Sequence, residues 1–108
     1  MTIDVITLQG CPKCAKIKNL LAQNNIEFTI KDCEDNPSIC DTLEDATNTM
    51  SYPMIVITQN NEIEKVIYVG EDYEELNKTR ELNGGILGIP VYSIDSMLSY
   101  VKNSLNLK

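Results

Sequence analysis

Residues 3–21 read IDVITLQGCPKCAKIKNLL, a short apolar run that passes directly into a Cys-x-x-Cys motif and a helical pattern. Ile3–Leu8 is rich in β-branched residues, as is typical of a buried strand, and Gln9-Gly10 ends that strand. Pro12 suits the first position of a helix, because its missing N–H would have no partner there. The stretch therefore predicts a strand followed at once by a helix, whose apolar face is formed by Cys14, Ile17, Leu20 and Leu21.

The two cysteines at this junction are placed for thiol chemistry. We expect Cys11 at the N-cap and Cys14 at the third helical position. The free N–H groups of the first turn then point at the Cys11 sulfur, and the helix end carries roughly +0.5 of a charge. Both effects favour the thiolate, which is the nucleophile in disulfide exchange, and Lys13 adds a positive charge beside it. The predicted roles are Cys11 as nucleophile and Cys14 as the cysteine that resolves a mixed disulfide.

Zinc binding is the alternative chemistry for these cysteines. The pattern Cys-Pro-x-Cys also occurs in zinc knuckles, and Cys33 and Cys40 could complete a four-cysteine site. However, six residues separate the second pair, and a helical face begins directly after Cys14, where a compact knuckle would turn. This context favours the redox interpretation and leaves Cys33 and Cys40 as small core residues without chemistry. A non-catalytic zinc adaptor built on all four cysteines stays the alternative.

Composition restricts the classes of function. Nine basic and sixteen acidic residues give a net charge of −7, which disfavours binding to nucleic acids and anionic membranes. There is no histidine, and no apolar stretch approaches the roughly 20 residues of a membrane span. The N-terminus MTIDVITLQG lacks a signal-peptide pattern, so we expect a cytoplasmic protein. Four cysteines are too few for a disulfide-stapled secreted scaffold.

The rest of the chain alternates between strand and helix patterns. It predicts a strand over 27–31, a helix from Asn36-Pro37, a strand over 54–57, a hairpin strand over 63–69 and a helix from Asp72 to about Thr79.

The pattern changes near the C-terminus. Three of the five glycines, Gly84, Gly85 and Gly88, predict a turning connection, and Ser93–Leu105 predicts an amphipathic helix. We expect one domain over residues 1–82 and an extension over 83–108. The helix of this extension should pack on its own domain in a monomer rather than join two chains. A third hypothesis, an interaction module, would give this extension the main role.

The order of these elements around Cys-x-x-Cys resembles the glutaredoxin family of the thioredoxin fold, over about residues 1–80. The resemblance implies an α/β fold of the form β-α-β-α-β-β-α, with a central mixed four-stranded sheet. It also implies a cis-proline before the third strand, beside the reactive cysteines. Pro53 lies 39 residues after Cys14, about where the family places this proline. Pro90 comes too late, because no hairpin and helix could follow it.

The resemblance implies a thiol-disulfide oxidoreductase that acts on protein disulfides or glutathione-mixed disulfides. Its substrates would be disulfide-containing proteins, with ribonucleotide reductase as a family example. Glutathione, as co-substrate, or a thioredoxin reductase would return the electrons, and no permanently bound cofactor is implied.

The family's glutathione-binding motifs match this sequence only in part. The resemblance places glutathione at Tyr52 and Pro53, where this sequence has Ser-Tyr-Pro instead of the family's Thr-Val-Pro. It also places glutathione at Gly70 and Asp72, which are the one glycine and the aspartate kept from the family's Gly-Gly-x-Asp motif. Asp72 is equally explained as a helix N-cap. Leu8 replaces a common lysine, and Lys13 replaces the tyrosine of Cys-Pro-Tyr-Cys. Thiol chemistry therefore carries over better than glutathione as the partner.

Overall fold

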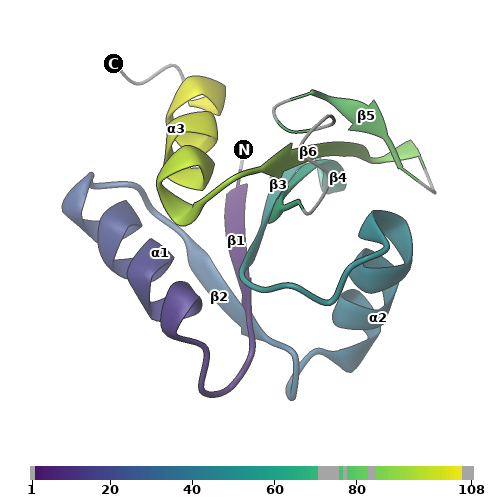
Figure 1. Ribbon diagram of the computed structural model, residues 1–108, viewed down its shortest axis with the longest axis horizontal. Coiled ribbons are helices and arrows are strands. Elements are labelled where there is room, and N and C mark those ends of the chain that lie inside the picture. Colours follow the sequence, from purple (N-terminus) through teal and green to yellow (C-terminus); the bar gives the residue numbers. More distant parts are fainter. Residues whose placement is uncertain (1, 71–75, 77, 83–84, 106–108) are drawn as a thin grey trace.

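A mixed β-sheet forms the centre of the molecule (Figure 1). The computed structural model describes residues 2–70, 76, 78–82 and 85–105. Within these residues six strands lie in the order β2-β1-β3-β4-β6-β5. The pairs β1–β2 and β4–β6 are parallel and the other neighbours are antiparallel. The strands are β1 (Thr2–Thr7), β2 (Thr29–Asp32), β3 (Met54–Gln59), β4 (Glu62–Val69), β5 (Arg80–Glu81) and β6 (Leu87–Val91).

Helices cover both faces of this sheet. The helices α1 (Pro12–Gln23) and α3 (Ile94–Ser104) lie together on one face, and α2 (Pro37–Thr47) lies on the other (Figure 1). Residues 54–57 of β3 are all apolar because both faces of the strand are covered. Ile55 and Ile57 join the core under α1 and α3, whereas Met54 and Val56 join the core under α2. The predicted thioredoxin fold is therefore confirmed in its first part, from β1 through α1, β2, α2 and β3 to β4.

The segment after Gly70 differs from the prediction. The helix expected from Asp72 to about Thr79 lies mostly outside the described residues, and Leu76, Lys78 and Thr79 are not helical. The expected glycine-rich connection contains a strand, β6, which pairs with β4. Gly88 allows this close packing, because a Cβ atom there would lie only 2.6 Å from Cδ1 of Leu82.

The C-terminal helix packs on its own chain, as expected. Ser93 is its N-cap, and the Ser93 side chain accepts a hydrogen bond from the Ser96 amide at 3.2 Å. Its buried residues share one core cluster with α1: Ile94, Met97 and Val101 from α3, and Ile17 and Leu21 from α1. None of the helices in the described parts of the chain is long and apolar enough to cross a membrane.

Candidate active site

Cys11 and Cys14 lie at the N-terminus of α1 and form a disulfide. Cys11 is the N-cap, with extended φ and ψ of −95° and 105°, and Cys14 is the third helical residue. The Cys14 amide donates a hydrogen bond to the Cys11 sulfur, with an N···S distance of 3.2 Å. Cys11 is partly exposed, whereas Cys14 is only 2% exposed. The predicted placement of both cysteines is therefore confirmed.

This geometry favours Cys11 as the reacting sulfur. A helix N-terminus stabilises negative charge, and the Cys14 amide would donate to a thiolate as it does to the disulfide sulfur. The Tyr52 carbonyl oxygen, 3.8 Å from the Cys11 sulfur, acts in the opposite direction, because a carbonyl accepts from a thiol and repels a thiolate. The amide is the closer group and the helix end adds to it, so the balance favours the thiolate.

A buried proline stands beside this pair. The Tyr52–Pro53 peptide bond is cis, as expected from the resemblance, and Pro53 is buried directly before β3. The contact between the Tyr52 carbonyl and Cys11 places this segment next to the disulfide. The structure thus brings together Cys11, Cys14, Tyr52 and Pro53.

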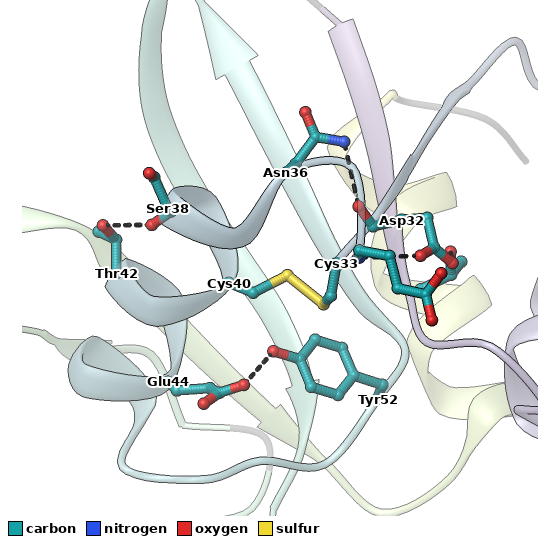
Figure 2. The surroundings of a disulfide bond; sticks show 10 residues. Asp32, Cys33, Asn36, Ser38, Cys40, Thr42, Glu44 and Tyr52 are labelled. Atoms are coloured by element: carbon teal, nitrogen blue, oxygen red, sulfur yellow. Dashed lines mark hydrogen bonds between the residues drawn. A yellow bond between two sulfur atoms is a disulfide. The ribbon is translucent and has the colours of Figure 1, made fainter.

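The Tyr52 side chain connects the same segment to α2. Its ring is 7% exposed, and its hydroxyl donates a hydrogen bond to the Glu44 carboxylate at 2.6 Å (Figure 2). Burial, the hydrogen bond to Glu44 and the charges of Glu44 and Asp41 all raise the pKa of the Tyr52 phenol above its ordinary value. Tyr52 therefore stays a neutral hydrogen-bond donor at physiological pH.

Tyr52→Phe should reveal this hydrogen bond through the pH dependence of stability. Because the folded-state pKa of Tyr52 is raised, its contribution is complete below the unfolded pKa of about 10 and falls as pH rises above that value. We expect the variant to lose about 1–2 kcal/mol of unfolding free energy at pH 7 and visibly less at about pH 11. Urea denaturation of both proteins at the two pH values measures this. An equal loss at both values would contradict the account.

A second disulfide, between Cys33 and Cys40, lies next to the Tyr52 ring (Figure 2). We expected Cys33 and Cys40 to be small core residues without chemistry, and this was wrong in that the two are joined by a disulfide. Cys33 lies in the turn after β2 and Cys40 in the first turn of α2, with Cα atoms 5.7 Å apart. The cysteines thus form two pairs, and no three or more His, Cys, Asp or Glu side chains among the described residues form a group able to hold a metal. The structure gives no support to the four-cysteine zinc site.

The other predicted site residues are placed less tightly. Lys13 is exposed in the first turn of α1, between the two cysteines. Gly70 donates its amide hydrogen to the Val91 carbonyl, and a Cβ atom there would lie 2.6 Å from Cβ of Pro90. Packing alone therefore accounts for this glycine. Asp72 lies outside the described residues, and a glutathione site at Gly70 and Asp72 stays a prediction.

Asp32 was missed from the sequence. A surface depression of about 460 Å³ lies beside the cysteines, and Lys18 and Asp32 both line it. The Asp32 carboxylate accepts hydrogen bonds from the Thr7 hydroxyl at 3.2 Å and from the Glu34 amide at 3.0 Å. Only the parallel pairing of β2 with β1 brings Asp32 to the end of the sheet where Cys11 lies, and no motif indicates this.

Comparison with known proteins found one matching family model and two similar solved structures. Residues 3–62, which are 60 of the 108, match the family model described as Glutaredoxin. A mutant of a thioredoxin-like protein is 26% identical, with a TM-score of 0.46 over 57% of this chain and 81% of the other. Thioredoxin 1 from the thermophilic eubacterium Thermosipho africanus is 16% identical, with a TM-score of 0.47 over 97% of this chain and 99% of the other. No match was found among curated proteins.

Proposed function

This chain belongs to the glutaredoxin family, whose thiol redox chemistry fits its Cys-x-x-Cys pair, and we propose that it reduces protein disulfides or glutathione-mixed disulfides. One observation carries the proposal. The partly exposed Cys11 sulfur caps α1 and accepts the Cys14 amide hydrogen, while Cys14 itself is buried one turn further on. The Cys11 sulfur is therefore both accessible to a substrate and placed where its thiolate would be stabilised.

Reduction of a disulfide proceeds in two exchanges. The Cys11 thiolate attacks one sulfur of the substrate disulfide, and the other substrate sulfur leaves as a thiolate. The Cys14 thiolate then attacks the Cys11 sulfur, which releases the second substrate sulfur and forms the Cys11–Cys14 disulfide. Two electrons pass from the protein to the substrate, and both substrate thiolates take up protons according to their pKa. Burial prevents Cys14 from starting the reaction.

The Tyr52–Pro53 segment supports binding of an extended substrate. Its Tyr52 carbonyl lies beside Cys11, where it can accept a hydrogen bond from the backbone of a bound peptide. The Tyr52 hydroxyl is hydrogen-bonded to Glu44, which anchors the side chain of the residue that carries this carbonyl.

Two electron donors fit the proposed function. Two molecules of glutathione can return the electrons to the Cys11–Cys14 disulfide through a mixed disulfide at Cys11. The positive charge of Lys13 favours the approach of this anionic thiol. A thioredoxin reductase is the other donor that the family resemblance suggests. Because this sequence matches the glutathione-binding motif only in part, we propose glutathione and a thioredoxin reductase as alternative donors.

Parallel coupled assays test this function. The oxidised full chain is mixed with a protein disulfide and, separately, with a glutathione-mixed disulfide, with either glutathione and its reductase or a thioredoxin reductase present. We expect turnover above the rate without the protein for at least one donor with each substrate. Absence of turnover for both substrates with both donors would contradict the proposal.

A further inference from the structure

The disulfide that joins the end of β2 to the start of α2 has a setting that differs from that of Cys11–Cys14. We propose that Cys33–Cys40 is a second redox-active site, reduced without unfolding by neutral or cationic thiols in preference to anionic ones. The reductant that fits it is a small thiol that is uncharged or cationic. This inference does not depend on the proposed function of Cys11.

Access to the bond is one-sided. Cys33 lies in a turn and is partly exposed, whereas Cys40 is only 4% exposed in the first turn of α2. An incoming thiolate can therefore bond to the Cys33 sulfur, and the Cys40 sulfur leaves as a thiolate. That leaving sulfur belongs to the fourth residue of the helix, where the helix end favours negative charge. A second thiol then attacks the mixed disulfide and frees Cys33, so that two thiols become one disulfide and the protein gains two electrons.

The surrounding contacts allow the bond to open in the folded protein. The Cys33 amide donates to the Thr7 carbonyl at 2.9 Å, and the Asn36 side chain donates to the Asp32 carbonyl at 3.1 Å. Leu43, which is fully buried, helps to hold the rest of α2. The hydrogen bond that Tyr52 donates to Glu44 does so as well (Figure 2). The disulfide also closes only a short loop, and short loops contribute less to stability than long ones. None of these contacts needs the S–S bond.

Charge separates the two disulfides. The stretch 32–45 contains six carboxylates and no basic residue: Asp32, Glu34, Asp35, Asp41, Glu44 and Asp45. Asp32 also lines the depression beside Cys11, so the difference between the two sites rests on the other five. The basic residue closest to this stretch in the sequence is Lys31, and its ammonium group lies 3.4 Å from the Asp4 carboxylate in an ion pair. Cys11–Cys14 instead lies on a helix with three lysines, of which Lys16 contacts Asp95 at 3.5 Å. An anionic thiol is therefore repelled at Cys33 and attracted at Cys11.

A series of small thiols of different charge tests this inference. The oxidised full chain is treated with cysteamine, 2-mercaptoethanol or 3-mercaptopropionate, each at the same thiolate concentration, then alkylated and mapped by mass spectrometry. Each rate is divided by the rate of the same thiol with an uncharged reference disulfide, bis(2-hydroxyethyl) disulfide, which removes the difference in intrinsic nucleophilicity between the thiols. At Cys33–Cys40 we expect this relative rate to fall by at least about threefold from the cationic to the anionic thiol, with an unchanged circular dichroism spectrum. At Cys11–Cys14 this order should be lost or reversed. Added salt should bring the rates at Cys33–Cys40 together.

Two variants serve as controls. Glu34 and Asp35 are exposed, so Glu34→Gln with Asp35→Asn should flatten the charge order at Cys33–Cys40 and leave the order at Cys11–Cys14 unchanged. A chain with Cys11→Ser and Cys14→Ser should still show the charge order at Cys33–Cys40, which separates this inference from the proposed function. The inference fails if Cys33 and Cys40 are labelled only after unfolding, or if the anionic thiol reduces them, relative to the reference disulfide, as fast as the cationic one.

Discussion

Cys11→Ser is expected to lower the reduction of both protein disulfides and glutathione-mixed disulfides by about 10³-fold or more, because no other exposed thiol caps a helix end. Cys14 is only 2% exposed and cannot begin the exchange from within the helix. The rates are measured in the coupled assays with the donor that supports the native protein.

Cys14→Ser is the matched control. It keeps the capping sulfur of Cys11 and should retain turnover of glutathione-mixed disulfides, which need one cysteine only. It should lose the reduction of protein disulfides, because the resolving thiol is gone. Equal loss of glutathione-mixed disulfide turnover in both variants, with both folded by circular dichroism, would show that the roles are assigned wrongly.

Met97→Ala is expected to lower the unfolding free energy by about 2–5 kcal/mol, since it leaves a cavity in the main core. Met97 is fully buried and belongs to the cluster that joins α3 to Ile17 and Leu21 of α1. Asn103→Ala, at an exposed position of the same helix, should change stability by no more than about 0.5 kcal/mol. Urea denaturation of the three proteins measures the difference. If both variants unfold at the same urea concentration, α3 is not part of the core in solution.

Local chemistry made the first half of the fold predictable. The β-branched run before Gly10, Pro12 at the first helical position and the uninterrupted apolar run of β3 each have one favourable structure. The N-cap position of Cys11 follows from the same signals. These signals need no knowledge of contacts distant in the sequence, which is why residues 2–69 agree closely with expectation.

Strand β6 was missed because its sequence contains the residues that usually interrupt strands. Gly88 is explained by its contact with the Leu82 side chain, which depends on the pairing of β5 with β6 and not on a strand pattern within residues 87–91. Pro90 is tolerated because β5 pairs only with Leu87 and Gly88, so in the described sheet β6 has a free edge beyond them. Both explanations require the pairing of segments that the sequence does not place side by side.

The Cys33–Cys40 disulfide was missed for a related reason. The pattern at Asn36-Pro37 correctly placed Cys40 in the first turn of α2, but nothing in the spacing shows that the turn after β2 directs Cys33 towards it. The low cysteine content also argued against structural disulfides. Asp32 was missed for the same reason, because its position beside Cys11 depends on the pairing of β2 with β1.

The most direct test of the account is the pH dependence of alkylation at each cysteine of the fully reduced protein. Alkylation rates are followed by mass spectrometry of the peptides that carry Cys11 and Cys14. We expect Cys11 to react faster at neutral pH, with a rate that rises with an apparent pKa below the value of about 8.5 for a free cysteine, while Cys14 reacts slowly. Equal rates at the two cysteines, with both apparent pKa values near that of a free cysteine, would contradict the claim that Cys11 is the activated nucleophile.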